Sequence, residues 1–597
     1  MRNRRYSRLS VVAVFLMVVT AILGACGDNT ATPVATTASA TTAAATTAAG
    51  TTKAATTAAA GATTAAATTA AAGATTAAAT TAAATAAVAS SGHPGIYREV
   101  WFGPDPTTLD PQAVQPAGYT TRYMYGNLYI GLSDYDEKAN IIPGIAKEWK
   151  VSADNKVWTF TLNPAAKFSS GRQVTAADVA YTYERAADSK LKSTSAYSTV
   201  SDIVGAAEKF AGTADKISGI KVIDDTTIEL TLKSSVPFLP SKLASSAAFI
   251  LNKDIVESDP KWWETKSAGA GPFQLAEWQH GQQIALTPNP NWFGSKVKLT
   301  RIEYLLVGDA TNRLSVFESG KTDAHWSLLT DEINRLKKDT GEMGKMFKQW
   351  DIGMGYILYV GMNANGYEPF KNAKVRQAVT MALDSQAIND TPLNGAGFTA
   401  TGLIPSGLPG YVPGQMKLKY DPTAAKKLLA DAGYADASKM PELVLSQVGS
   451  GPDIAGTTQF IQEALKTNLG MNVRINVTDQ QSFIAQLQQG KVAAWASLMI
   501  ASLPDQYSVL SQFSSKNPQN VFGYNNPEYD ALLQQALTIS DDKARNAVYN
   551  QLETKLMDDA AIMPVMWAKF YTLQRPYVSG LRVNVLGIMP YTNLEVK

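Results

Sequence analysis

A run made almost entirely of alanine and threonine, from about residue 29 to residue 91, divides this 597-residue chain. Alanine favours helix, whereas the repeated Thr-Thr pairs and the glycines oppose it. No stretch of the run presents an apolar face that could pack, so we interpret it as a disordered spacer. A coil of about 60 residues spans roughly 45 Å on average. The packed core must therefore come from the residues that follow the run.

The residues before the run are typical of a bacterial export signal. Four arginines precede an apolar run from Leu9 to Leu23, and the chain's single cysteine follows in the order Leu-Gly-Ala-Cys. The apolar run is shorter than the roughly 20 residues that a spanning helix needs. The stretch resembles the lipobox, in which the cysteine is acylated and becomes the first mature residue. We expect residues 1–25 to be a lipoprotein signal peptide, Cys26 to be lipidated and residues 26–92 to be a tether. The alternative is an uncleaved anchor with an incidental cysteine.

The composition limits the classes of function. The chain carries 53 basic and 51 acidic residues, four of the basic ones in the leader, so no excess of positive charge favours nucleic acid. With Cys26 used by lipid, no disulfide, thiolate nucleophile or cysteine metal site is available. The sequence has no Gly-x-Ser-x-Gly elbow and no phosphate or dinucleotide loop, and its three histidines lack metal-ligand spacing. We therefore expect neither an enzyme nor a bound metal or cofactor.

Local patterns in the first half of the globular part predict antiparallel hairpins. Alternating apolar residues predict that 149–151 pairs with 157–162 across a short turn. Thr175 is predicted to begin a helix as its N-cap, with the acid Asp178 three residues later. The first half is therefore predicted to hold an insertion rich in hairpins.

The second half changes to alternating strands and helices. A strand, a helix and a further strand are predicted at 443–445, 454–469 and 473–477. Asp421 and Pro422 are predicted to begin an earlier helix, which ends at Gly433. A strand–helix–strand unit of this length requires parallel strands, so the chain is predicted to be α/β.

Seven stretches, in order along the chain, carry a resemblance to a known family: 106–111, 168–179, 269–273, 289–293, 307–309 with 320–323, 375–378 and 425–434. Together they resemble the family-5 extracellular solute-binding proteins, which include the oligopeptide- and dipeptide-binding receptors of ABC importers. The resemblance covers about residues 97–597. We interpret most of these residues as scaffold, with Asp178 capping a helix, Gly171 at positive φ and Arg376 in a structural pairing.

The resemblance implies a two-lobed α/β fold of the large class II periplasmic-binding-protein type, with an extra hairpin-rich subdomain. Lobe I would comprise residues 93–130, 241–354 and 566–597, with 131–240 as the inserted subdomain. Lobe II would comprise 355–565. The chain would cross between the lobes near Gly355 and near Pro564.

The resemblance also implies the function. A monomeric receptor, lipid-anchored on the extracytoplasmic face of the cell membrane, would capture a solute between its lobes and deliver it to an ABC permease. A peptide is the first choice of ligand. The alternatives are a sugar, an opine or a nickel chelate, or a sensor or chaperone-like lipoprotein that works without a transporter.

The ligand site is implied by the same resemblance. Peptide-binding members place an aspartate for the ligand's free amine in the region that here spans 501–506, and Ser502 stands at that position. A buried ammonium without a carboxylate partner is costly. Therefore either Asp505 or another acid takes this role, or the ligand lacks the amine. The other candidate wall residues, for each of which core packing is at least as good an explanation, are Tyr119, Tyr125, Trp326, Tyr356 and Trp495.

Mass spectrometry of the intact mature protein tests the leader and the spacer. We expect the mature chain to begin at Cys26 and to carry added lipid. We also hypothesise O-linked sugars on the spacer threonines, and a mass that shows only lipid added refutes them. A chain that retains residues 1–25 contradicts the lipoprotein prediction.

Overall fold

The structure is a computed structural model that describes residues 92–101, 105–113, 119–449, 452–587 and 591–597. The leader, Cys26 and the Ala/Thr spacer lie outside these residues, so their assignments stay predictions. Within the described ranges, no helix is long and apolar enough to cross a membrane. The same ranges contain no group of histidine, cysteine and carboxylate side chains placed to hold a metal ion.

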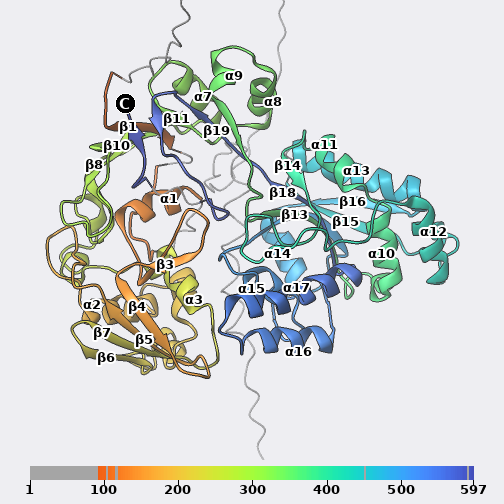
Figure 1. Ribbon diagram of the computed structural model, residues 1–597. Helices are drawn as coiled ribbons and strands as arrows, with labels where there is room; N and C mark the ends of the chain where they lie inside the picture. Colours follow the sequence, from red (N-terminus) through yellow and green to blue (C-terminus); the bar gives the residue numbers. More distant parts are fainter. Residues whose placement is uncertain (1–91, 102–104, 114–118, 450–451, 588–590) are drawn as a thin grey trace, which may run out of the picture. The chain divides into compact units, whose positions relative to one another are not determined.

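A seven-stranded mixed sheet forms the centre of lobe I (Figure 1), in the order β12-β19-β11-β1-β10-β9-β8. Strand β1 is parallel to both of its neighbours, β10 and β11. Tyr97, Glu99 and Trp101 alternate along β1 and are all buried. The strands are β1 (Ile96–Trp101), β8 (Phe273–Gln279), β9 (Gln283–Pro288), β10 (Arg301–Leu306), β11 (Ala324–His325), β12 (Phe347–Trp350) and β19 (Phe570–Gln574). The helices of this lobe are α1 (Tyr119–Leu128), α6 (Lys253–Val256), α7 (Ala310–Glu318), α8 (Thr330–Lys338) and α9 (Glu342–Met346).

The inserted subdomain is built on a four-stranded antiparallel sheet in the order β4-β5-β7-β6. The predicted hairpin is confirmed, since Trp149 pairs with Phe160. The strands are β4 (Ala146–Val151), β5 (Val157–Leu162), β6 (Ile220–Asp224) and β7 (Thr227–Thr231), beside the short pair β2 (Ser133–Tyr135) and β3 (Ile141–Pro143). The helices are α2 (Ala176–Ala186), α3 (Thr194–Val200), α4 (Ala206–Phe210) and α5 (Leu239–Leu243).

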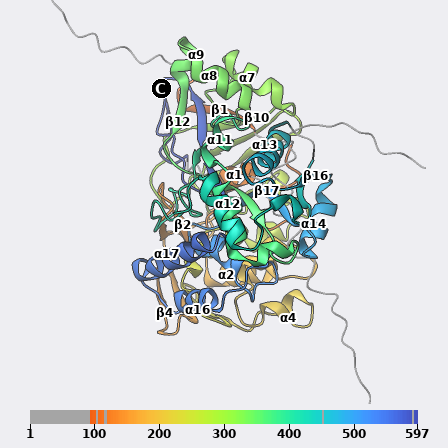
Figure 2. The same ribbon diagram turned by 90° about the vertical axis from the view of Figure 1, so that its right-hand side faces the viewer.

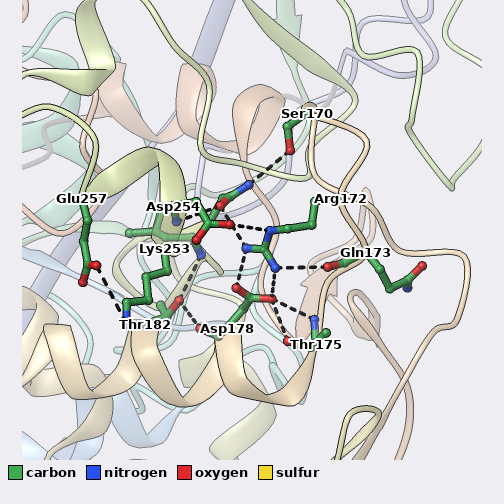
Figure 3. A network of polar contacts seen from close by, with 11 residues as sticks. Ser170, Arg172, Gln173, Thr175, Asp178, Thr182, Lys253, Asp254 and Glu257 are labelled. Atoms are coloured by element: carbon green, nitrogen blue, oxygen red, sulfur yellow. Dashed lines mark hydrogen bonds and ion pairs between the residues drawn. The ribbon is translucent and has the colours of Figure 1, made fainter.

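The most diagnostic sequence motif, 168–179, builds scaffold (Figure 3). Asp178 closes a capping box with Thr175 at the start of α2 and accepts a 2.7 Å hydrogen bond from Arg172. The Arg172 guanidinium also forms an ion pair with Asp254 at 3.1 Å. Gly171 has φ +86°, as predicted. The motif therefore fixes the start of α2 against lobe I.

Lobe II is organised around a six-stranded sheet in the order β14-β18-β13-β17-β15-β16. The predicted strand–helix–strand unit is confirmed, because β15 and β16 are parallel and joined by α13. The strands are β13 (Tyr356–Met362), β14 (Gly397–Thr399), β15 (Leu443–Val448), β16 (Val473–Thr478), β17 (Ala494–Ile500) and β18 (Ile562–Ala568). The helices are α10 (Ala373–Met381), α11 (Ser385–Asp390), α12 (Pro422–Asp431), α13 (Pro452–Leu469), α14 (Gln480–Gln488), α15 (Tyr507–Leu510), α16 (Pro527–Ala536) and α17 (Asp542–Asp558).

Helices cover both faces of this sheet. Every residue of β13 is buried. Leu358 and Val360 share one core with α10, α12 and α13, and Figure 2 shows α12 and α13 on the side turned toward the viewer. Ile357 and Tyr359, which alternate with them, pack with residues of α14, α16 and α17. The uninterrupted apolar run of β13 follows from this burial on two faces.

Predicted details of lobe II are confirmed as well. Asp421 accepts a 2.9 Å hydrogen bond from the backbone of Ala424 at the start of α12, and Gly433 has φ +96° just after the helix. The buried Arg376 guanidinium donates to the backbone carbonyls of Phe370 and Asp559. These residues serve the scaffold, as the sequence indicates.

The described strands pass from one sheet to the other at two places. The first crossing segment lies between β12 and β13, and it includes Gly355 as predicted. The sequence places the second crossing near Pro564, but Pro564 lies inside β18, opposite Tyr359 at a register shift. The chain leaves the lobe II sheet at Ala568 and enters the lobe I sheet at Phe570. The lobe boundary therefore falls at Lys569, later than the sequence indicates.

Loss of the Asp178 side chain tests the scaffold role of the motif. We expect Asp178→Ala to lower the free energy of unfolding by about 2 kcal/mol, because the capping box and the Arg172 pair disappear together. Denaturant unfolding measures this change. Asp215→Ala, at an exposed position of the same subdomain, is the control and should stay within about 0.5 kcal/mol. Equal stabilities of the two variants would contradict the assignment.

Candidate functional site at the junction of the lobes

Two pairs of apolar side chains lie at or just beyond strand ends near the crossing segments. Tyr356 begins β13 and lies opposite Ile500, the last residue of β17. Phe570 begins β19, and its ring stacks on Trp326 with centroids 6.2 Å apart. All four belong to or pack against one core cluster, and all except Tyr356 remain partly exposed. We call Trp326, Tyr356, Ile500 and Phe570 the junction cluster.

Backbone hydrogen bonds hold the crossing segments beside this cluster. Ala501 N–H donates to the carbonyl of Gly355 at 2.7 Å, and Gly355 N–H donates to Val585 at 2.8 Å. A β-carbon at Gly355 would lie 3.2 Å from the Ala501 methyl group, which is a tight contact. Ser502 follows directly and is exposed. The position where the resemblance implies a ligand-binding acid is therefore next to the junction cluster and open to solvent.

A buried carboxylate lies beneath Trp326. Glu99 is 1% exposed. It accepts hydrogen bonds from the hydroxyls of Tyr97 at 2.9 Å and Tyr591 at 2.8 Å, and from the indole N–H of Trp326 at 3.3 Å. In the described part of the chain, no cationic side chain forms an ion pair with Glu99. Burial raises the pKa of its carboxyl from 4.5 to about 7, and the three hydrogen bonds oppose this shift.

Two of the sequence-predicted residues lie in the core of lobe II. Trp495 is fully buried, and its indole N–H donates to the Tyr359 hydroxyl at 3.0 Å. Asp505 is 7% exposed, forms an ion pair with Arg545 at 3.2 Å and accepts a 2.8 Å hydrogen bond from the backbone of Tyr507. Burial raises the pKa of the Asp505 carboxyl, and the Arg545 charge opposes that shift. In this arrangement Asp505 already has a cationic partner.

The remaining predicted residues lie on or next to α1. Tyr125 is 2% exposed, donates to the Thr108 carbonyl at 3.3 Å and packs edge-on against Tyr129. Tyr119 begins α1, and its side chain lies outside the described residues. Of the predicted residues, Trp326 and Tyr356 thus belong to the junction cluster, and Ser502 follows Ile500 by two positions along the chain. The ligand roles of the predicted residues stay predictions.

Sequence reasoning missed Glu99, Ile500 and Phe570. A signal for Glu99 was present, because Tyr97, Glu99 and Trp101 alternate and period-two spacing places all three on one face of a strand. An acid between two inward aromatic residues indicates a buried carboxyl. Ile500 and Phe570 carry no comparable signal.

Comparisons with known proteins point to one family. The model of the bacterial extracellular solute-binding proteins, family 5, middle region, matches residues 140–521. The dipeptide-binding protein DppE of Bacillus subtilis is 28% identical over 502 residues, which cover 81% of this chain and 89% of that protein. The periplasmic oligopeptide-binding protein OppA of Salmonella typhimurium is 28% identical over 510 residues, with 83% and 90% covered.

Solved structures share the fold. The unliganded open form of the murein tripeptide-binding protein MppA superposes with a TM-score of 0.76 at 25% identity, over 84% of this chain and 97% of that one. OppA of Listeria monocytogenes bound to peptide gives a TM-score of 0.61 at 24% identity, over 84% and 98%. The likeness thus covers nearly all of each solved chain and 84% of this one.

The buried carboxyl predicts pH-dependent stability. Because the folded chain binds the Glu99 proton more tightly than the unfolded chain, this group stabilises the fold fully below about pH 4.5 and loses that contribution as the pH rises through 7. The difference amounts to about 3 kcal/mol. We expect Glu99→Gln to remove it, so that the stability of the variant relative to wild type increases between pH 5 and 8. Denaturant unfolding across this range measures the change.

A matched surface variant makes this test specific. Glu208 is exposed, and Glu208→Gln should leave the pH profile of the wild type unchanged. A stability difference between Glu99→Gln and wild type that does not vary with pH would contradict the burial of an ionisable carboxyl.

Proposed function

Because the chain belongs to the bacterial extracellular solute-binding proteins of family 5, we propose that it is a receptor that captures a peptide between its two lobes and delivers it to an ABC permease. The fold is the two-lobed class II periplasmic-binding-protein type with a hairpin-rich insertion. The match over more than four fifths of the chain to relatives that are named as dipeptide- and oligopeptide-binding proteins supports a peptide ligand. The partly exposed junction cluster supports a capture site at the junction of the lobes.

Capture follows from the connection between the lobes. Each lobe has its own sheet, and the crossing segments are the only strand connections between these two sheets in the described residues. A ligand that contacts both lobes stabilises the closed arrangement, because it gains its full set of contacts only there. Aromatic rings and exposed backbone groups accept side chains of varied sequence.

We propose that the receptor works at the extracytoplasmic face of the cell membrane, held by lipid at Cys26. The leader, the cysteine in a lipobox-like stretch and the long spacer support this position. The family is one of extracellular proteins. We propose a monomer with no enzymatic activity, in keeping with relatives that are named as binding proteins.

A non-peptide ligand is the second candidate. Ser502 stands where the resemblance implies an acid, and Asp505 already forms an ion pair with Arg545. A sugar, an opine or a nickel chelate would need no acid at that position.

Native mass spectrometry of the captured ligand, followed by a thermal-shift screen of peptides, sugars and nickel chelates, distinguishes these candidates. We expect peptides to raise the melting temperature, because a ligand at 100 times its dissociation constant adds about 2.7 kcal/mol of stability. Trp326→Ala should weaken peptide binding at least about tenfold, since the ring forms part of the junction cluster. Trp149→Ala, a half-buried tryptophan of the inserted sheet, is the control and should bind as wild type does. A shift with sugars or chelates alone would overturn the peptide proposal.

A further inference from the structure

Three acidic side chains are candidates to pair with the ammonium group of a ligand at the junction. Asp505 is ion-paired with Arg545, so a ligand would have to displace a buried guanidinium. Asp351 lies exposed on the first crossing segment, where solvent screens its charge. Glu99 lies beneath Trp326, shielded from solvent and hydrogen-bonded only to neutral groups.

The three hydrogen-bond donors to Glu99 differ in burial and in bond length, and therefore in how easily a ligand could take their place. Tyr97 and Tyr591 are fully buried, and their hydroxyls donate at 2.9 and 2.8 Å. Trp326 is only half-buried, and its indole N–H makes the longest bond, at 3.3 Å. The Trp326 ring also stacks on the partly exposed Phe570. Of the three donors, Trp326 is thus the one that belongs to the junction cluster, and it links the carboxylate to the junction.

The charge balance around Glu99 favours a cation. An ionised carboxylate that is buried among neutral donors is costly, and a charge-assisted bond from an ammonium group offsets that cost. The other ionisable groups that face it, Tyr97, Tyr304 and Tyr591, all have a pKa raised well above 10 by burial and stay neutral. Asp323, whose charge acts on Tyr97, lies 3.4 Å from His93. Glu99 is thus the group that can supply negative charge directly beneath the junction cluster.

We propose that Glu99 is the acceptor for the ammonium group of the bound ligand, reached when the Trp326 indole turns aside and gives up its hydrogen bond. The inference rests on the proposed function, since it assigns the amine-recognising acid of the same peptide site. It also accounts for Ser502 at the position where the resemblance implies an acid. The ligand class is a solute with a free, protonated amine.

Binding then releases a proton. The carboxyl form of Glu99 and the ligand ammonium become a carboxylate–ammonium pair, and the carboxyl proton passes to the buffer. With half-titration near pH 7, about one proton should be released for each ligand bound at pH 6, and the release should decrease as the pH rises toward 7.5. Above about pH 8 the free peptide amine, with an ordinary pKa of about 8, is itself deprotonated and takes up a proton on binding. Affinity for the amine ligand should therefore rise between about pH 5.5 and 7 and fall above about pH 8.

Isothermal titration calorimetry with a peptide and its N-acetylated form, in buffers of different ionisation enthalpy, tests the proposal. The peptide is the strongest binder from the thermal-shift screen. In wild type, acetylation should weaken binding about 30-fold, the size of a charged hydrogen bond. In Glu99→Gln, acetylation should weaken binding less than about threefold, and proton release should vanish.

Two further variants separate ligand contact from a structural role. Trp326→Phe keeps a ring but removes the competing N–H, so the preference for the free amine should persist or increase. If Glu99 served only to fix Trp326, this variant would weaken both peptides as Glu99→Gln does, which would overturn the proposal. Asp351→Asn is the control acid and should keep the 30-fold discrimination.

The remaining outcomes of the titration each decide whether Glu99 binds the ligand amine. Loss of discrimination in Asp351→Asn, with discrimination kept in Glu99→Gln, assigns the amine to Asp351 and overturns the inference. Equal binding of the two peptides by wild type overturns the inference and leaves the peptide receptor intact. If no peptide binds, the proposed function fails, and the inference fails with it.

Discussion

The hydrogen-bonded crossing between the two sheets is the constraint on which the rest of the structure depends. Met354 N–H donates to Ala568 at 3.0 Å, and Ala501 N–H donates to Gly355 at 2.7 Å, so both crossing segments and the end of β17 are held together. The crossing places residues of lobe I, lobe II and the connections beside one another. The junction cluster exists because distant parts of the chain return to this place.

The Glu99 carboxylate is costly for the fold and useful for a receptor. Its burial among neutral donors reduces stability at neutral pH, when the group ionises. Glu553, with a pKa also raised to about 7 by burial, accepts a hydrogen bond from the Ile404 backbone within lobe II. Glu99 differs because one of its donors, Trp326, belongs to the junction cluster. A destabilising group at this place is expected where binding compensates for it.

Local patterns in the sequence predicted much of the fold, because neighbours along the chain determine them. The hairpin that pairs Trp149 with Phe160, and the capping box of Thr175 and Asp178, depend on residues only a few positions apart. The crossing near Gly355 agrees with the structure, whereas the second crossing lies at Lys569 because β18 continues past Pro564. The site was harder to predict, since its contacts are long-range. Glu99 meets Trp326 across 227 positions and Tyr591 across 492.

Sequence alone also could not separate tryptophans that fill a core from those that line a junction. Trp495 and Trp326 are the same residue type, yet one is fully buried against Tyr359 and the other is half-exposed. The sequence could not show that Asp505 is already paired, because its ion-pair partner Arg545 lies 40 positions away.

A crystal structure with a bound free-amine peptide tests the central claim most directly. The account predicts the ammonium nitrogen about 2.8 Å from a Glu99 carboxylate oxygen, with the Trp326 indole displaced. An ammonium bound elsewhere, with the Trp326–Glu99 hydrogen bond intact, would contradict it.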